Sequence, residues 1–170
     1  MWSGKLISIY IAPAAVAATQ SLEEARVVAG KGLEGDRYFL GQGTFSNNPG
    51  SGRHVTLIES EALEALERDS GPHLAPGAHR RNLVTRGVPL NHLVNRDFRV
   101  GEVVLRGLRL CEPCEHLETL TQPGTKMALL HRAGLRADIV QGGIIRVGDT
   151  IEEAQQGAES AITAPAGRAS

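Results

Sequence analysis

Cysteine is scarce in this chain of 170 residues, which contains only Cys111 and Cys114. A chain of this length can bury an adequate core without disulfide bonds, so a single domain is expected. Aromatic residues make up 4% of the sequence and the formal net charge is −1. These values exclude the stacking surface and the basic field of a general nucleic-acid-binding protein. No apolar run is long enough to span a bilayer, so no membrane partner is expected.

The N-terminal segment superficially resembles a secretory signal, because one lysine precedes an apolar run and small residues. The run is rich in β-branched residues and ends at Pro13, which is typical of a short strand rather than of a leucine-rich helix. We therefore expect the protein to be cytoplasmic. The reducing conditions of that compartment also disfavour a structural disulfide.

Short strands separated by glycine and proline are the dominant pattern of the chain. We predict strands at residues 5–12, 25–29, 54–58, 80–87, 98–110, 137–143 and 144–151. In the 98–110 segment apolar and polar residues alternate on both sides of Gly107, which predicts a hairpin or a bent strand pair. Helical spacing occurs at residues 59–68, 89–94, 115–121 and 125–133, and Ser60 is a candidate cap of the first helix.

This mixture predicts a mostly β fold with a few helices, specifically a closed or strongly curved β-barrel with helices at its rim. Residues 30–52 are rich in glycine and are expected to form a long functional loop. The domain is expected to cover residues 1–153. Residues 154–170 contain few core-forming side chains and are expected to be a disordered tail.

The two cysteines occupy the turn CEPC directly after the clearest strand pattern. Spacing alone permits a metal half-site, a redox dithiol, one working thiolate with a neighbour, or two inert buried residues. A zinc site would need four ligands, for which the chain offers His116 and the distant His131 beside the cysteines. Cys114 precedes a helical segment, whose unpaired amides and dipole favour a thiolate.

Two further segments carry groups suited to anion binding. In GLEGDRY, residues 32–38, Gly35 permits positive φ, so that a tight loop can present Asp36 and Arg37 toward one point. In RRN, residues 80–82, arginine can form bidentate bonds to a phosphate or carboxylate beside an asparagine amide. An ordinary turn and surface arginines are equally compatible with these two patterns.

In their order along the chain, these segments resemble the MOSC domain, the family named after the C-terminal domain of molybdenum cofactor sulfurases. The resemblance covers about residues 5–152 and is closest to standalone bacterial members. It is carried by GLEGDRY, HVTLIESEAL, RRNLVTRGV, FRVGEVVLRGLRLCEPCEHLE and LRADIVQGGIIRVGDTI.

The resemblance implies a β-barrel-like fold and one functional cysteine, Cys114, which carries sulfur as a persulfide or ligates molybdenum directly. Cys111 and His116 are then accessory residues. The cofactor implied is the molybdenum cofactor, a pterin, and a sulfur transferase or a molybdenum-dependent oxidoreductase is the implied activity. The residues implied to bind its phosphate are Gly35, Asp36, Arg37, Arg80, Arg81 and Asn82.

The chain differs from full sulfurases because it has no room for a cysteine desulfurase domain, so no pyridoxal-phosphate site is expected. The implied partners are therefore a sulfur donor such as a cysteine desulfurase, and a molybdoenzyme or cofactor acceptor. Two alternatives remain open from the residues: a non-catalytic binding module for an anionic metabolite, and a zinc-stabilised structural domain.

Overall fold

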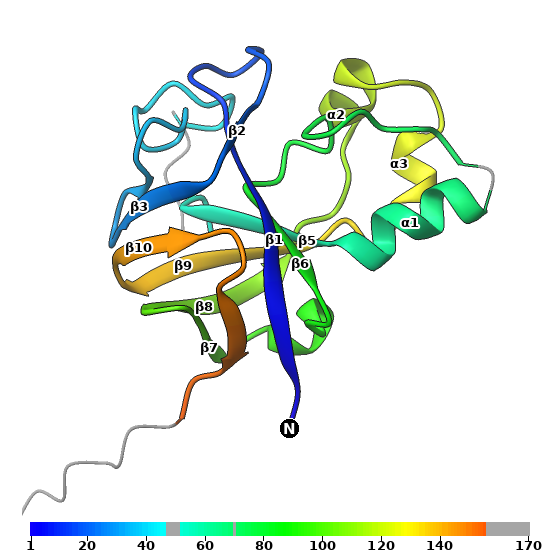
Figure 1. The fold of residues 1–170 in the computed structure, drawn as a ribbon. Helices are drawn as coiled ribbons and strands as arrows, with labels where there is room; N and C mark the ends of the chain where they lie inside the picture. The colour runs from blue at the N-terminus through cyan, green and yellow to red at the C-terminus, as the bar shows by residue number, and fades with distance from the viewer. Residues whose placement is uncertain (47–51, 70, 156–170) are drawn as a thin grey trace, which may run out of the picture.

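A closed seven-stranded β-barrel forms the body of the protein in this computed structural model, which describes residues 1–46, 52–69 and 71–155 (Figure 1). The strands pair in the order β11-β7-β8-β9-β5-β6-β1, and β1 pairs again with β11 to close the ring. Among the strand pairs of the described residues, only β5–β6 is parallel. The predicted mostly β barrel is therefore confirmed. The barrel strands are β1 Ser3–Ile11, β5 Val55–Glu59, β6 Leu83–Arg86, β7 Asp97–Val100, β8 Val103–Leu110, β9 Leu135–Gln141 and β11 Thr150–Glu153.

Four short strands complete the described β structure. β2 (Gln20–Leu22) extends the barrel sheet beside β1, while β10 (Gly143–Arg146), β3 (Glu24–Val28) and β4 (Gly32–Leu33) form a separate small sheet. β2 and β4 were missed from the sequence because two or three residues cannot show a period. The segment predicted as one strand at 144–151 contributes to two, β10 and β11. A turn at Gly148, with φ +94°, separates them.

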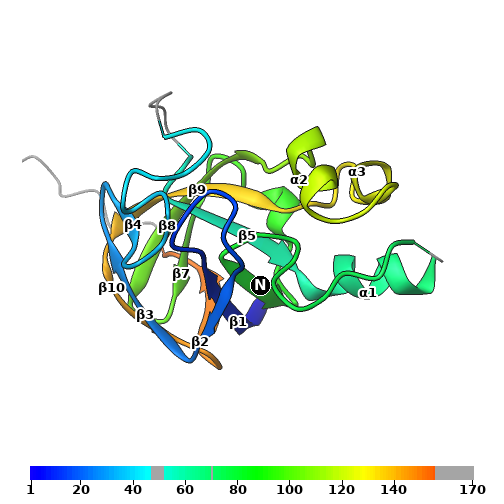
Figure 2. The ribbon, with the colours of Figure 1, turned by 90° about the horizontal axis from the view of Figure 1, so that it is seen from above.

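Three α-helices gather on one side of the barrel, opposite the small sheet (Figures 1 and 2). These are α1 Ser60–Arg68, α2 Glu115–Leu120 and α3 Thr125–Ala128, and Leu90–Leu93 adds a 3₁₀ turn. Ser60 is not the cap of α1, because it is already the first helical residue and its hydroxyl bonds Glu61. α3 is shorter than predicted. It ends at Ala128, and His131, with φ +64°, departs from helical geometry inside the predicted range.

Two apolar clusters hold these layers together. The larger one fills the barrel, where Phe98 and Leu105 join Leu6 and Ile9 among fully buried side chains. The smaller one joins the helices to the outside of β5 and β6, and its buried members are Ile58, Leu66, Val84, Leu117, Leu129 and Ala133. Burial of apolar surface therefore positions α2, which begins directly after the cysteine turn.

The predicted strand pair at residues 98–110 turns at Gly101 rather than at Gly107. β7 and β8 pair directly across this turn, with Val100 opposite Val103. At Gly107 the register of β8 against β9 shifts, and a Cβ there would overlap the Leu93 carbonyl oxygen. Gly107 therefore permits a bend and a close backbone approach within β8.

The expected tail from residue 154 is described only at its first two positions, and residues 156–170 lie outside the described residues. None of the helices formed by the described residues has the length and apolar character needed to cross a membrane.

Candidate functional site

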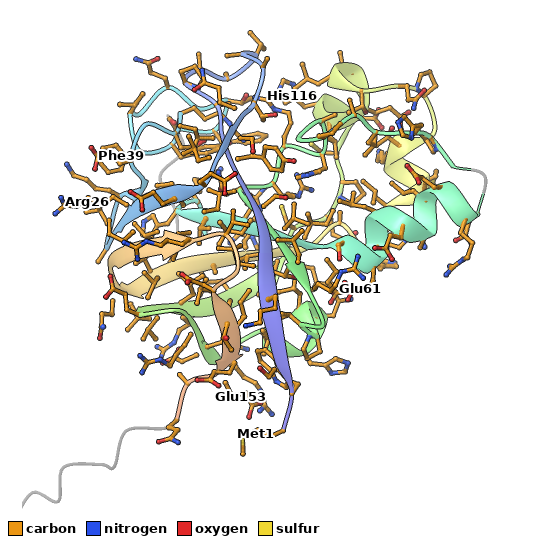
Figure 3. All side chains as sticks on the ribbon, in the orientation of Figure 1. Met1, Arg26, Phe39, Glu61, His116 and Glu153 are labelled. Carbon is orange, nitrogen blue, oxygen red and sulfur yellow. The ribbon has the colours of Figure 1, made fainter. Side chains whose placement is uncertain are left out.

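A small pocket lies where the cysteine turn meets the loops that follow β4 and precede β6. Its volume is about 60 Å³. Residues from all three predicted segments line it together: Arg37, Arg80, Arg81, Cys111, Cys114 and His116. His116 lies at the end of the barrel away from the N-terminus (Figure 3). Segments distant in sequence thus converge on one volume.

The two cysteines of the turn have different surroundings. Both are free thiols; Cys114 is exposed, whereas Cys111 is 1% exposed. The Cys111 backbone is bonded on both sides, since its N–H donates to the Gly134 carbonyl at 2.8 Å and its carbonyl accepts from Arg81 Nη2 at 3.0 Å. Cys111 is therefore a fixed, buried member of the pocket wall, and Cys114 is the accessible thiol.

The GLEGDRY loop is organised around the buried carboxylate of Asp36. Its Oδ1 accepts from the Ala12 N–H at 3.0 Å and from Arg37 Nη1 at 3.2 Å, and its Oδ2 accepts from the Tyr38 N–H at 3.3 Å. Gly35 has φ +86°, a conformation that suits glycine. Asp36 thereby orients Arg37, which is 9% exposed and lines the pocket.

The guanidinium of Arg80 hydrogen-bonds mainly to the backbone of the loop after β1. Its Nη1 and Nη2 donate to the carbonyls of Ala17 and Ala15, each at 2.8 Å, and its own backbone has φ +61°. Burial, followed by the neighbouring charge of Arg37, lowers the pKa of Arg80 from its ordinary value. Arg80 therefore brings positive charge to the pocket while most of its donors brace a loop.

Arg81 is bonded to three backbone carbonyls around the pocket. Nε donates to Ala133 O at 2.9 Å, Nη1 to His79 O at 3.4 Å and Nη2 to Cys111 O at 3.0 Å. The side chain links three segments: the cysteine turn, the loop before β9 and the loop before β6. The contacts of Arg81 make it the brace of the cysteine turn, and its predicted contact with a cofactor phosphate remains a prediction.

Asn82 has a different place from the other predicted residues, since it does not line this pocket among the described residues. Its Oδ1 accepts from the Thr56 N–H at 3.1 Å and from Thr56 Oγ1 at 3.2 Å, while Nδ2 donates to Tyr10 O at 3.1 Å. Asn82 therefore ties β1 to β5 beneath the site. Its predicted contact with a cofactor remains a prediction.

Several lining residues were missed from the sequence. They are Tyr38, Thr44, Phe45, Thr56, Glu112, Leu117 and Arg136. Arg136 stands at a polar position of the strand segment LRADIV, where alternation gives only the face and not what that face meets. Thr44 Oγ1 lies 3.3 Å from His116 Nε2, joining the glycine-rich loop to α2.

Positive charge exceeds negative charge around the pocket. Among the described residues, Arg37 pairs with Asp36, but Arg80, Arg81 and Arg136 make no ion pair. The lining carboxylate, Glu112, is bonded instead to His131, with 3.2 Å between Oε1 and Nδ1. Within the described ranges, three guanidinium groups therefore line the pocket without a carboxylate partner.

The cysteines and histidines do not assemble the four-ligand zinc site considered above. Within residues 1–46, 52–69 and 71–155, no group of three or more His, Cys, Asp or Glu side chains is arranged to hold a metal ion. His131 pairs with Glu112 rather than turning toward the thiols. A metal bound here would rely on one thiolate and on ligands that the metal itself brings.

His79 supports the site from below as a buried neutral imidazole. Its Nδ1 accepts the Arg81 N–H at 3.0 Å, and burial first, then the Arg81 charge, lowers its pKa to about 3. In the unfolded chain the pKa of this histidine is 6.5, so the unfolded state binds a proton to His79 more readily than the folded state does. The free energy of unfolding should therefore decrease as pH falls from about 6.5 toward 3.

We expect His79→Asn, which keeps an acceptor for Arg81, to reduce this slope by up to about 1.4 kcal/mol per pH unit. Urea unfolding of both proteins between pH 4 and pH 7.5 measures it. Parallel stability curves for the two proteins would contradict a neutral buried His79. The control is His73→Asn, the same change at an exposed histidine. This variant should show the same dependence of unfolding free energy on pH as the wild type.

This barrel, with a cysteine turn facing an arginine-lined pocket, is a MOSC domain: the family model matches residues 28–152, and the chain belongs to that family. The family is linked to the molybdenum cofactor and to sulfur chemistry. The resemblance predicted from the motifs is thus confirmed. No curated protein matches the chain.

Solved structures share the fold at low sequence identity. YuaD from Bacillus subtilis superposes with a TM-score of 0.72 at 19% identity, covering 91% of this chain and 100% of that one. YiiM from Geobacillus stearothermophilus gives 0.69 at 15% identity, covering 91% and 76% of the two chains. YiiM from Escherichia coli gives 0.63 at 16% identity, covering 91% and 72%.

Proposed function

We propose that this protein is a molybdenum-cofactor-linked sulfur carrier or small molybdenum-dependent enzyme in which Cys114 is the working residue. The observation that carries the proposal is the exposed thiol of Cys114 in the same pocket as three guanidinium groups that have no carboxylate partner among the described residues. A thiolate or persulfide is a soft ligand or sulfur donor, and arginine is suited to oxyanions. The pocket therefore combines the two affinities that a sulfur-bearing or phosphate-bearing cofactor requires.

The residues present fit one end of such a cofactor. A volume of about 60 Å³ admits a group of phosphate size, and the rest of a pterin would extend outside. Arg37, Arg80 and Arg136 would hold the anionic group, while Cys114 would ligate the metal or bear the sulfur. When bound, the cofactor would supply the redox or sulfur-accepting centre.

The roles of the other predicted residues follow from their bonds. Gly35 and Asp36 shape the loop that presents Arg37, and Arg81 fixes the turn that presents Cys114. Asn82 acts indirectly, through the β1–β5 connection. Delivery of sulfur to Cys114 would fall to a partner such as a cysteine desulfurase, and a molybdoenzyme or cofactor-bearing protein would receive it.

Loading of the purified protein tests this proposal. After expression with molybdate, we expect molybdenum, pterin or sulfane sulfur in the wild-type protein and loss of all three in Cys114→Ser, because serine offers neither a soft ligand nor a persulfide. Metal analysis, pterin fluorescence and intact-mass spectrometry provide the measurements. Cys111→Ser is the matched variant and should keep most of the loading. Equal loading of wild type and Cys114→Ser would exclude a working Cys114.

A second candidate is a binding module for an anionic metabolite, favoured by the charges of Arg80, Arg81 and Arg136, which the described carboxylates leave unpaired. In that case ligand binding would survive Cys114→Ser and be lost in Arg80→Ala. The same pair of variants therefore separates the two functions.

A further inference from the structure

The pocket has an excess of positive charge that the described part of the chain does not balance. Arg81 is 9% exposed, and its hydrogen bonds go to three carbonyl oxygens rather than to a carboxylate. Arg80 likewise donates to two carbonyls. Burying a charge is costly unless an opposite charge accompanies it. The missing counter-charge points to an anionic ligand, and three uncompensated guanidiniums favour one with two negative charges.

The pocket suits a small anionic group held beside the thiol. Its volume of about 60 Å³ is lined both by the arginines and by Cys111, Cys114 and His116. A ligand seated there would touch guanidinium groups and a thiol at once. It should therefore contain an oxyanion and, one or two bonds away, an atom with which a thiolate can react.

We propose that the pocket binds thiosulfate, or another small thiosulfonate, and that Cys114 removes its sulfane sulfur. This inference rests on the proposed sulfur-carrier function and names the sulfur donor for the same site. In this binding mode the sulfonate oxygens face Arg136, within the positive field of Arg80 and Arg81, and the terminal sulfur faces Cys114. Thiosulfate carries two negative charges, which matches the unbalanced charge of the pocket.

The chemistry balances without a further oxidant or reductant. The Cys114 thiol gives up its proton, with His116 in the same pocket as a candidate acceptor, and the thiolate attacks the terminal sulfur of thiosulfate. A new S–S bond forms on Cys114 while the S–S bond of thiosulfate breaks, and its electron pair leaves with sulfite. The protein is left as a persulfide. A nucleophilic acceptor then takes the sulfane sulfur and restores the thiolate.

Other anions explain fewer of the observations. Phosphate and sulfate would satisfy the arginines but offer no atom to the thiol. A low-molecular-weight persulfide would react with Cys114 but has no sulfonate for the arginines to hold. Thiosulfate uses both halves of the pocket.

The assay is the transfer of sulfur from thiosulfate to cyanide, which forms thiocyanate and sulfite. Wild-type protein is expected to show turnover that saturates with thiosulfate, and after thiosulfate alone its mass should increase by one sulfur atom, located on Cys114 by peptide mapping. Cys114→Ser should show neither. Thiocyanate formation no faster in wild type than in Cys114→Ser would overturn the proposal.

Arg136→Gln tests the oxyanion half of the pocket. Among the described residues, the side chain of Arg136 makes one long backbone contact, 3.5 Å from Nη1 to Gly52 O, so its loss should disturb the fold little. Loss of a charge-assisted bond, worth about 1.5–3 kcal/mol, should raise the KM for thiosulfate about 10- to 100-fold. The matched control is Arg99→Gln, the same change at an exposed position on β7, which should leave KM unchanged. An unchanged KM in Arg136→Gln would also overturn the proposal.

A sulfur donor without a sulfonate distinguishes the thiosulfate proposal from the sulfur-carrier function on which it rests. Inorganic polysulfide, which contains sulfane sulfur but no sulfonate, should load Cys114 in the wild-type protein whether or not thiosulfate is a donor. Loading by polysulfide but not by thiosulfate would refute thiosulfate as the donor and leave a sulfur carrier. Loading by neither donor would refute both thiosulfate as the donor and the sulfur-carrier function.

Discussion

Arg81→Met is expected to lower the free energy of unfolding by about 3–5 kcal/mol. Methionine fills much of the same volume but removes the donors that bond Ala133 O, His79 O and Cys111 O. A hydrogen bond to a charged group contributes about 1.5–3 kcal/mol, and a buried acceptor left without a partner adds its desolvation cost. The loss should exceed the gain from removing a buried charge, because three segments lose their common anchor.

Chemical denaturation measures this change. Arg106→Met is the control, because Arg106 is an exposed arginine of β8 whose partner is Asp97, and exposed pairs contribute about 0–1 kcal/mol. Arg81→Met should also increase the reactivity of Cys111 toward a thiol reagent, since its carbonyl anchor is gone. A loss below about 1 kcal/mol with unchanged thiol reactivity would show that Arg81 is no brace.

Gly134→Ala is expected to destabilise the protein by about 3–5 kcal/mol. Gly134 has φ +110°, where a side chain is strained, and its Cβ would overlap the Leu57 carbonyl oxygen. Forced repacking of this kind costs about 1–3 kcal/mol or more, and the backbone conformation adds about 1–2 kcal/mol. The Gly134 carbonyl accepts the Cys111 N–H, so any shift is transmitted to the cysteine turn.

Gly148→Ala provides the matched control. Gly148 has φ +94°, but a Cβ added there would meet no heavy atom of the described residues within 4 Å, so only the conformational cost of about 1–2 kcal/mol applies. The difference between the two variants in thermal or urea unfolding isolates the steric part. Equal destabilisation would mean that the Leu57 contact relaxes freely.

The barrel could be predicted because its strands carry the required pattern. Residues 98–110 alternate clearly, and the buried positions of β7 and β8 follow that alternation. The turn was placed less well, since Gly101 and Gly107 look alike in sequence. Only their surroundings distinguish a hairpin turn from a bend against Leu93. Strands of two or three residues, such as β4, have no periodic signal at all.

The sequence predicted several of the residues that form the candidate site, but not the hydrogen bonds that these residues make. The motifs brought Cys114, Arg37 and Arg80 to one place, as the structure does. Sequence could not show that Arg80 and Arg81 donate mainly to backbone carbonyls, because those carbonyls belong to loops distant along the chain. Arg136 was missed because the alternation of β9 shows which face a residue is on but not what that face meets.

The pairing of β1 with β11 joins Ser3 to Glu152, nearly the whole described chain apart. Contacts of such long sequence separation carry a large loop-closure entropy and slow folding. During synthesis, the part of β1 from Ser3 to Lys5 has no partner on one edge until β11 is made, and an open edge invites pairing with other chains. We therefore expect barrel closure to come late in folding, and a ribosome-stalled chain that ends before β11 to aggregate more readily than the finished chain.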